Sequence, residues 1–376
     1  MYSLFIPFCD LAVTRLVPAG APVLVAVDDT LFRRSGRRVH AAGWHHDGAT
    51  KGPAKHRVSW GNSWVLAGIV VDLPFTDRPL CLPVAFALWC KGGPTKQVLA
   101  GRLVTAIATA CPDRAVHVVA DAWYAGVDGA AGAAQGRTRE RGGLPDGVSL
   151  TSRLRVNATL HEIAAPVPGK AGRPRRIGTK IGTPQALAIR SQWTPTQVHR
   201  YGRTDHVHLA QTTCLWYGVY RSRAVRIILV RDGDTSTGYD LALITTDLTS
   251  PAETIVTRYA ARWSIETAIE DAKQITGVGE ARNRTTNAVE RTVPFGLITQ
   301  AIVVTWYTLH GHHPDIAAHR RENAPWYRSK TQPAYLDMIV QLRRTLIAAR
   351  FRAGNPRNPT PQETLAVLEA WAEAAA

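Results

Sequence analysis

Short hydrophobic runs separated by turn-forming residues dominate the first 155 positions of the chain. Their β-branched content predicts five strands, at 23–30, 64–73, 80–88, 115–120 and 148–154. Between the third and fourth strands, hydrophobic residues recur at helical spacing and predict a helix over 95–110. The first three strands are close enough in sequence for a meander, whereas the later strands need crossovers. The pattern therefore predicts a mixed α/β sheet.

The pattern changes after residue 155. Further short runs predict a β-rich insertion, with strands at 186–189, 207–213, 219–220, 225–230 and 241–245. Helical patterns follow: a long helix from 250 to about 276, an apolar run at 296–309 that is too short to span a bilayer, and helices over 326–351 and 360–376. We therefore divide the chain into a short N-terminal remnant (1–22), an α/β core in two parts (23–155 and 247–310), a β-rich insertion (156–246) and a helical C-terminal region (311–376).

The long helix that begins near Ser250 has clear start and stop signals. Ser250 can cap it, Pro251 fits the first helical position, and Glu253 can close a capping box with Ser250. Gly277 is suited to end it, because glycine adopts the left-handed conformation common after a helix. We expect one continuous helix between these signals.

One face of this helix carries an unusual set of side chains. At roughly 100° per residue, Tyr259, Arg262, Glu266 and Lys273 fall within about 60° of one another. An aromatic ring, two cations and one carboxylate do not form a hydrophobic core. The stripe predicts a face turned toward phosphate, with one acid among the bases to hold a cation.

The overall charge also favours a polyanionic partner. Lys and Arg number 45 against 29 Asp and Glu, for a net charge of +16 and a pI near 10.1, so nucleic acid is the first expectation and an acidic membrane surface the second. Compositional bias explains the preference for Arg over Lys but not the shortage of acids. None of the five cysteines pairs as CxxC, which is typical of reduced thiols in a cytosol and argues against zinc. The N-terminus lacks the basic leader of a secretion signal.

Three acids stand out by their position. Asp28 or Asp29 ends the first strand, Asp121 ends the fourth strand, and Glu266 lies on the cationic helix face. Hard divalent metals prefer such carboxylate oxygens. Two ions about 3.5–4 Å apart can activate a nucleophile and stabilise the leaving oxygen in an in-line phosphoryl displacement. Convergence of these acids would therefore predict a metal-dependent phosphoryl-transfer site.

The same residues resemble a known family. Tyr259-x2-Arg262-x3-Glu266-x6-Lys273 matches the Tyr-Arg-Glu-Lys signature of bacterial insertion-sequence transposases of the DDE type. The first acid strand of that family is similar to VAVDDT, whose Asp-x-Thr order selects Asp28 over Asp29. The second acid segment is similar to VVADAWYAG, which selects Asp121. The resemblance covers roughly residues 23–309.

The resemblance implies a ribonuclease H-like mixed-sheet core, interrupted by the β-rich insertion and followed by a helical C-terminal region. It implies metal-dependent cleavage of double-stranded DNA at inverted-repeat ends and transfer of the freed 3′-hydroxyl into target DNA, in the cytoplasm and without a membrane. Asp28, Asp121 and Glu266 would hold two Mg²⁺ ions, which Mn²⁺ can replace, and a homodimer on the DNA is left open. The implied phosphate grips and base contact are Tyr259, Arg262, Lys273 and Trp263.

Three alternatives follow from the same residues. Trp263, like Trp123, suits core packing as well as stacking on a displaced base. A metal-dependent nuclease or resolvase would share the acids but would not join DNA ends. Family members usually have a helical domain before the first acid, whereas Asp28 here follows only 27 residues. A truncated, inactive DNA-binding derivative is therefore the third alternative.

Overall fold

The computed structural model describes residues 2–48, 58–126, 134–135, 138–139, 144–165, 175–233, 236–323, 329–354 and 360–375. Its strands are β1 (Val23–Arg33), β2 (Gly43–His46), β3 (Val58–Val71), β4 (Leu80–Trp89), β5 (Val116–Ala120), β6 (Ala134–Gln135), β7 (Thr138–Arg139), β8 (Val148–Arg153), β9 (Leu160–Ile163), β10 (Ile177–Gly182), β11 (Thr194–Arg200), β12 (Arg203–Cys214), β13 (Val225–Arg231) and β14 (Leu241–Thr245). Its helices are α1 (Tyr2–Leu16), α2 (Lys96–Ala110), η1 (Ala122–Gly126), α3 (Pro184–Arg190), α4 (Tyr217–Tyr220), α5 (Ala252–Ala261), α6 (Trp263–Gln274), α7 (Thr286–Trp306), η2 (Tyr307–Gly311), α8 (Ile316–Asn323), α9 (Tyr335–Gly354) and α10 (Pro361–Ala375).

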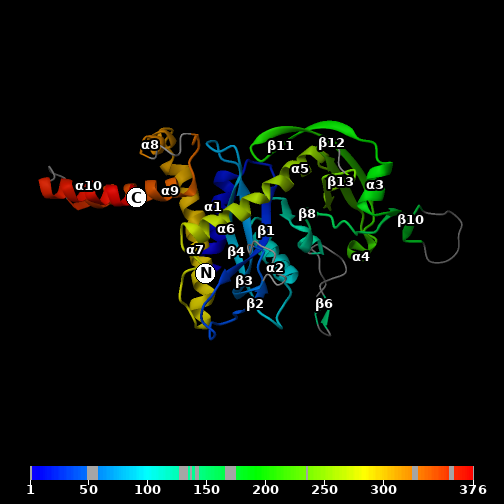
Figure 1. Cartoon of the computed structure of the whole chain (residues 1–376), viewed down its shortest axis with the longest axis horizontal. Helices are drawn as coiled ribbons and strands as arrows, with labels where there is room; N and C mark the ends of the chain where they lie inside the picture. Colours follow the sequence, from blue (N-terminus) through cyan, green and yellow to red (C-terminus); the bar gives the residue numbers. More distant parts are fainter. Residues whose placement is uncertain are drawn as a thin grey trace.

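Within the described ranges, ten strands form one mixed sheet at the centre of the molecule (Figure 1). β4, β3 and β1 form an antiparallel meander, and β5 and β8 continue from β1 in parallel. This order, β4-β3-β1-β5-β8, is the ribonuclease H-like arrangement, so the predicted fold class is confirmed. β14 then joins β8 antiparallel, and β13, β12 and β11 follow it. The strands of the predicted insertion therefore extend the same sheet.

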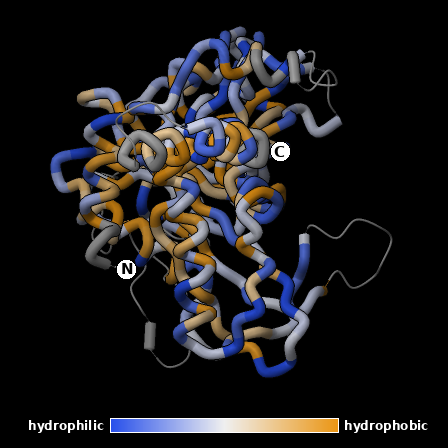
Figure 2. Tube along the Cα trace, turned by 90° about the vertical axis from the view of Figure 1, so that its left-hand side faces the viewer, coloured by the Kyte–Doolittle hydropathy of each residue, from blue (hydrophilic) through white to orange (hydrophobic). Residues whose placement is uncertain are grey.

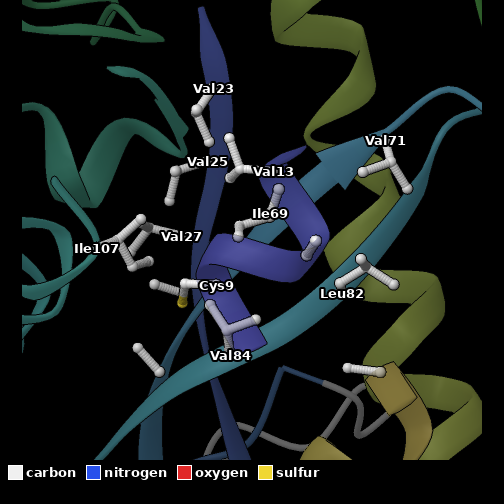
Figure 3. Packing of buried hydrophobic residues seen from close by; sticks show 14 of the residues in the cluster. Cys9, Val13, Val23, Val25, Val27, Ile69, Val71, Leu82, Val84 and Ile107 are labelled. Atoms are coloured by element: carbon white, nitrogen blue, oxygen red, sulfur yellow. The ribbon is translucent and has the colours of Figure 1, made fainter. Parts of the chain in front are cut away.

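The sheet separates two hydrophobic layers. Val23, Val25 and Val27 alternate along β1 and point toward α1 and α2, where they pack with residues of β3 and β4 (Figure 3). Ala26 and Phe32 point to the opposite face, which α6 and α7 cover. Successive side chains of a strand face opposite ways. The consecutive acids Asp28 and Asp29, in the middle of β1, therefore face different sides of the sheet.

Two strands predicted in the insertion are wrong. Residues 186–189 belong to α3, and residues 219–220 belong to α4. The start of α3 follows helix rules, because Thr183 Oγ1 accepts a hydrogen bond from the backbone N–H of Ala186 and Pro184 occupies the first turn. These capping residues outweigh a short apolar run of four residues.

The predicted long helix is broken in the middle. α5 ends at Ala261 and α6 begins at Trp263, with tight i→i−3 hydrogen bonds on both sides of Arg262. The predicted capping box is not formed either, because Ser250 Oγ donates to Asp247 Oδ2 at 2.6 Å. α5 therefore begins one residue later, without a side-chain cap. Gly277 ends the segment as predicted, with φ of 62°.

α7 is longer than the apolar run in the sequence suggested. The helix of residues 286–311, which contains the apolar run of 296–309, is long and apolar enough to cross a membrane by length and composition alone, as the core helix of a protein also can be. The prediction of a buried helix is confirmed, because Val289, Val293 and Leu297 are fully buried against the core. Hydrophilic and hydrophobic residues interleave along much of the trace (Figure 2).

The helices predicted over 326–351 and 360–376 correspond to α9 and α10. α9 begins only at Tyr335, and residues 329–334 are not helical, so that part of the first prediction is wrong. α10 extends away from the sheet (Figure 1). α10 begins with a capping box: the backbone N–H of Thr360 donates to Glu363 Oε2 at 2.7 Å, and the backbone N–H of Glu363 donates to Thr360 Oγ1 at 3.2 Å. Part of the predicted 326–351 helix, residues 326–328, lies outside the described residues.

We expect Gly61→Ala to weaken the sheet beside the end of β1. A Cβ at this position would lie 2.3 Å from the backbone oxygen of Phe32, which cannot move without breaking the β1–β3 pairing. The free energy of unfolding in urea should fall by about 1–3 kcal/mol. Gly218→Ala is the control, since its Cβ would meet no atom within 4 Å. Equal stability of the two variants would contradict the packing at Gly61.

Candidate active site

Asp28 and Asp121 lie on neighbouring strands. Asp121 directly follows β5, as predicted, whereas Asp28 is in the middle of β1, so the prediction that an acid ends the first strand is wrong. β1 and β5 run in parallel with Val27 opposite Ala120, and each acid is the next residue along its chain. Alternation places Asp28 on the face of the sheet that α6 covers, and Asp121 continues the same face from Val119. Asp121 Oδ1 accepts a hydrogen bond from the backbone N–H of Trp123 at 2.8 Å, which fixes its orientation.

Arg262 joins the first and third acids. Its Nη1 lies 3.3 Å from Asp28 Oδ2, and its Nη2 donates to Glu266 Oε1 at 2.6 Å. Glu266 is in the first turn of α6, and the guanidinium is only 14% exposed. The break between α5 and α6 therefore places a buried cation between carboxylates that are 238 positions apart in the sequence.

The surroundings of Asp28 disfavour its ionised form. Burial raises its pKa to about 7 despite the opposing effects of Arg262 and of the Asp29 backbone N–H. The carboxylates of Asp29 and Asp121 raise the pKa further. The ionised form of Asp28 therefore lacks sufficient positive charge around it, even with Arg262 in contact.

The donor chemistry of this region fits a hard divalent cation. The three acids supply oxygen ligands, and the raised pKa of Asp28 shows that its charge is incompletely balanced. In the described ranges, however, no group of three His, Cys, Asp or Glu side chains is already assembled to hold a metal. Arg262 lies between two of the acids, so ligands would close around an ion only after the guanidinium moves.

The other two members of the helical stripe lie on either side of Arg262. Tyr259 is 9% exposed, and its ring centroid is 6.0 Å from the Arg262 guanidinium carbon. Lys273 Nζ donates to Thr30 Oγ1 at 2.7 Å and lies 5.3 Å from the Phe32 ring centroid. Thr30 is two residues beyond Asp28 on the same face of β1. The side chains of the stripe therefore face the same side of the sheet as Asp28.

Two exposed tryptophans flank the acids. Trp263 follows Arg262 and is 51% exposed, and Trp123, two residues after Asp121, is 56% exposed. Core packing was one of two interpretations for both rings, and it is wrong. Both indole rings are available for stacking on a ligand next to the carboxylates.

Asp29 has a different environment from Asp28. It faces α2, where its carboxylate pairs with Lys96 Nζ and accepts a hydrogen bond from Tyr124 Oη at 2.8 Å. Sequence reasoning did not identify Lys96; it considered Tyr124 for stacking or core packing but did not connect it with Asp29. Their only sequence signal is that each follows a strand end, and the partner acid is 67 or 95 positions away.

The comparison with known families bears on this arrangement of acids. Residues 19–298, more than half of the chain, match the model of the family described as "Transposase DDE domain". The chain belongs to the DDE transposase family. The match spans β1, β5 and α6, which carry the three acids. Transposases of this family act on DNA by phosphoryl transfer and generally use divalent metal ions. No curated protein gives a significant match.

A buried polar network beneath α5 supports the catalytic region of the transposase. His117 on β5 is 1% exposed, and its ring nitrogens lie 2.8 Å from Ser149 Oγ and 2.9 Å from Thr151 Oγ1. Asp247 lies 3.8 Å from the same ring and pairs with Arg258 of α5 at 3.2 Å. The network ties α5 to the strand that leads to the second acid, four residues beyond His117. Sequence reasoning missed it, because its members come from four separate segments.

The network predicts loss of stability in acid. Burial, with a smaller contribution from Arg258, lowers the pKa of His117 from 6.5 to about 3. The folded state therefore favours the neutral ring, and stability that is complete above pH 6.5 is lost as the pH falls toward 3. At pH 5 the loss should be about 2 kcal/mol. His117→Asn removes this titration, so urea denaturation should show the stability difference between wild type and variant shrinking by that amount from pH 7.5 to pH 5.

The matched control is His206→Asn, at an exposed position of β12. Its stability difference from wild type should stay the same over this pH range. A constant difference for His117→Asn as well would contradict a buried neutral ring.

Proposed function

We propose that this transposase cuts DNA at the inverted-repeat ends of its element and joins the freed 3′-hydroxyl to target DNA. Asp28, Asp121 and Glu266 are its proposed catalytic residues. The observation that carries the proposal is the convergence on Arg262: the acids of β1 and α6 both bind its guanidinium, and the acid of β5 lies next to the first in strand register. Two carboxylates that share one buried arginine, with a third beside the first in strand register, are best explained by a site that binds a cation.

The carboxylates would hold Mg²⁺, or Mn²⁺ in its place, and two such ions would supply Lewis-acid activation and charge stabilisation for in-line displacement at phosphorus. The chain's own residues have separate roles. Asp28, the most desolvated acid, would be the ligand with the greatest need for positive charge. Trp123 would orient Asp121 through its backbone N–H. Glu266 would be supplied by α6, directly after the break in the helix.

The cationic stripe would hold the DNA strand at the acids. In the DNA-free protein the two Nη atoms of Arg262 contact two different carboxylates, and a phosphate could replace both as a bidentate partner of the guanidinium. Lys273, held by Thr30, would contact a second phosphate further along β1. Trp263 and Trp123 would stack on bases displaced near the cut. The signature Tyr-Arg-Glu-Lys spacing would thus serve positioning, while the acids would serve the chemistry.

The direct test uses labelled duplexes made from the DNA that flanks the gene. With Mg²⁺, the protein should release a defined 3′-hydroxyl end and join it to a target plasmid, and EDTA should abolish both products. Cleavage without joined products would favour a related nuclease instead. Binding without cleavage, with Mg²⁺ or Mn²⁺, would favour a DNA-binding derivative and contradict the proposal.

A further inference from the structure

The sheet face beneath α5 changes from apolar to polar where that helix begins. Under α5, the inward residues of β11, β12 and β13 are apolar and buried: Val198, Val207, Leu209, Ile228 and Val230. Beyond the first turn of α5, the same face continues with polar side chains: Thr194, Gln211, Thr213 and Arg226. Gln211 and Thr213 are exposed. A sheet face that only packs a helix has no need of this polar extension.

These residues form the floor of a groove of about 930 Å³. One wall is the C-terminal end of α3, with Arg190 and Ser191, and the other is the segment 248–253 that enters α5. One edge of β12 is open here. In the described part of the chain, β11 pairs with this edge only as far as Leu209, and the next residue paired on it is Leu215, just after β12, which pairs with His161. The lining is dominated by hydroxyl, amide and guanidinium groups, unlike the apolar lining of most small-molecule pockets.

Two features give the groove a positive potential. α5 begins there without a side-chain cap, so its first backbone N–H groups have no capping oxygen, although Glu253 in its first turn and the nearby Asp247 offset part of the positive charge. Arg226 lines the groove and is only 7% exposed; its Nη1 donates to Ser250 O at 2.6 Å, whereas its buried Nε has no hydrogen-bond acceptor. Glu253 is the one carboxylate of the lining and lies at the exposed rim. A buried guanidinium with an unmet donor beside a helix N-terminus suits an anion.

We propose that this groove binds the sugar-phosphate backbone of DNA, as a second contact separate from the catalytic acids. The inference rests on the proposed function for its choice of polyanion. From Ala252 to Arg262, α5 rises about 15 Å at 1.5 Å per residue. At about 3.4 Å per nucleotide along one strand, DNA held at the acids would reach the groove some four nucleotides away. The groove therefore reads backbone position and not base identity.

The test adds either negative or positive charge to the floor of the groove. Gln211→Glu with Thr213→Glu places two carboxylates beside the bound phosphates, at exposed positions where folding is unaffected. Fluorescence anisotropy with a labelled 30-base-pair duplex should show binding about tenfold weaker at 200 mM salt relative to wild type, and the salt dependence should change through the loss of about two phosphate contacts. Gln211→Lys should have the opposite effect and tighten DNA binding. Arg226→Ala is less suitable, because removing a buried guanidinium disturbs folding.

Matched controls place the same charges elsewhere. Thr105→Glu with Thr109→Glu matches the two added carboxylates, and Thr109→Lys matches the added lysine; both positions are exposed on α2, on the other side of the catalytic sheet. Equal effects on α2 and in the groove would mean that only net charge matters and would overturn the proposal. Unchanged DNA binding combined with altered self-association would assign the open edge of β12 to a protein strand and would also overturn it. Cleavage by the wild type is measured separately. If the groove variants bind DNA like the wild type, the groove proposal fails but the proposed function does not. If the wild type binds DNA through the groove but does not cleave it, the proposed function fails but the groove proposal does not.

Discussion

Glu266→Gln, Asp28→Asn or Asp121→Asn should each lower the rate of metal-dependent DNA cleavage by about 10³-fold or more, while DNA affinity stays largely unchanged. The reason is that each substitution removes an anionic oxygen from the cation site, and such a site provides several kcal/mol of charge stabilisation in the transition state. The substitutions are nearly isosteric; Asp28 and Asp121 are on the face of the sheet that α6 covers, and Glu266 is on α6 itself. Single-turnover cleavage of a labelled duplex measures the rate, and anisotropy measures the affinity.

Asp29→Asn is the matched control, because it changes the same group one position along β1 on the opposite face. Its carboxylate binds Lys96 and Tyr124, so its loss should reduce stability by about 1–3 kcal/mol through unmet hydrogen bonds and should have a milder effect on cleavage. If Asp29→Asn is as inactive as Asp28→Asn while remaining folded, the choice of Asp28 is wrong. Cleavage retained by any of the three variants would remove that acid from the site.

Arg262→Gln should tighten the binding of Mn²⁺ to the DNA-free protein by about tenfold or more, and should weaken DNA binding and cleavage. In the wild type, the guanidinium contacts Asp28 and Glu266 and competes with any other cation for their charge. A unit charge about 4 Å from a partly buried carboxylate carries an interaction of a few kcal/mol, part of which the ion would gain. Isothermal titration calorimetry without DNA gives this result independently of activity.

Arg258→Gln is the control for the arginine. It is on α5, one turn earlier, and pairs with Asp247 and not with the acids. Its Mn²⁺ affinity should equal that of the wild type. An unchanged Mn²⁺ affinity in Arg262→Gln would mean that the guanidinium does not occupy the place of the ion.

Much of the catalytic core could be predicted because its signals are local. The β-branched runs before Asp28 and Asp121 mark strands whether or not their partners are known, and parallel pairing of β1 with β5 then brings the two acids together. The spacing of Arg262 and Glu266 is a single helical turn, so their contact also follows from the sequence. In the C-terminal region, Thr360 and Glu363 form a capping box for the same reason.

The errors occur where a distant residue decides the outcome. Ser250 looks like a cap, but Asp247 takes its hydroxyl, and the network of His117 and Arg258 holds Asp247 in place. The break at Arg262 has no local signal, because no Gly or Pro is present and the ion pairs that accompany it reach across to β1. Likewise, nothing near Asp29 indicates Lys96. Side-chain partners far apart in sequence become visible only once the sheet is assembled.

The extension of the catalytic sheet by β14, β13 and β12 has a mechanical consequence. Because these strands continue the hydrogen-bonded ladder that begins at β1, the span from Asp121 to Gln211 crosses no flexible joint. The sheet would then set a fixed distance between the groove that binds a DNA strand and the acids that cut it. Adding or removing a strand in this extension would move the DNA contact by about 4.8 Å relative to the acids, which is more than the length of one nucleotide, without altering a catalytic residue.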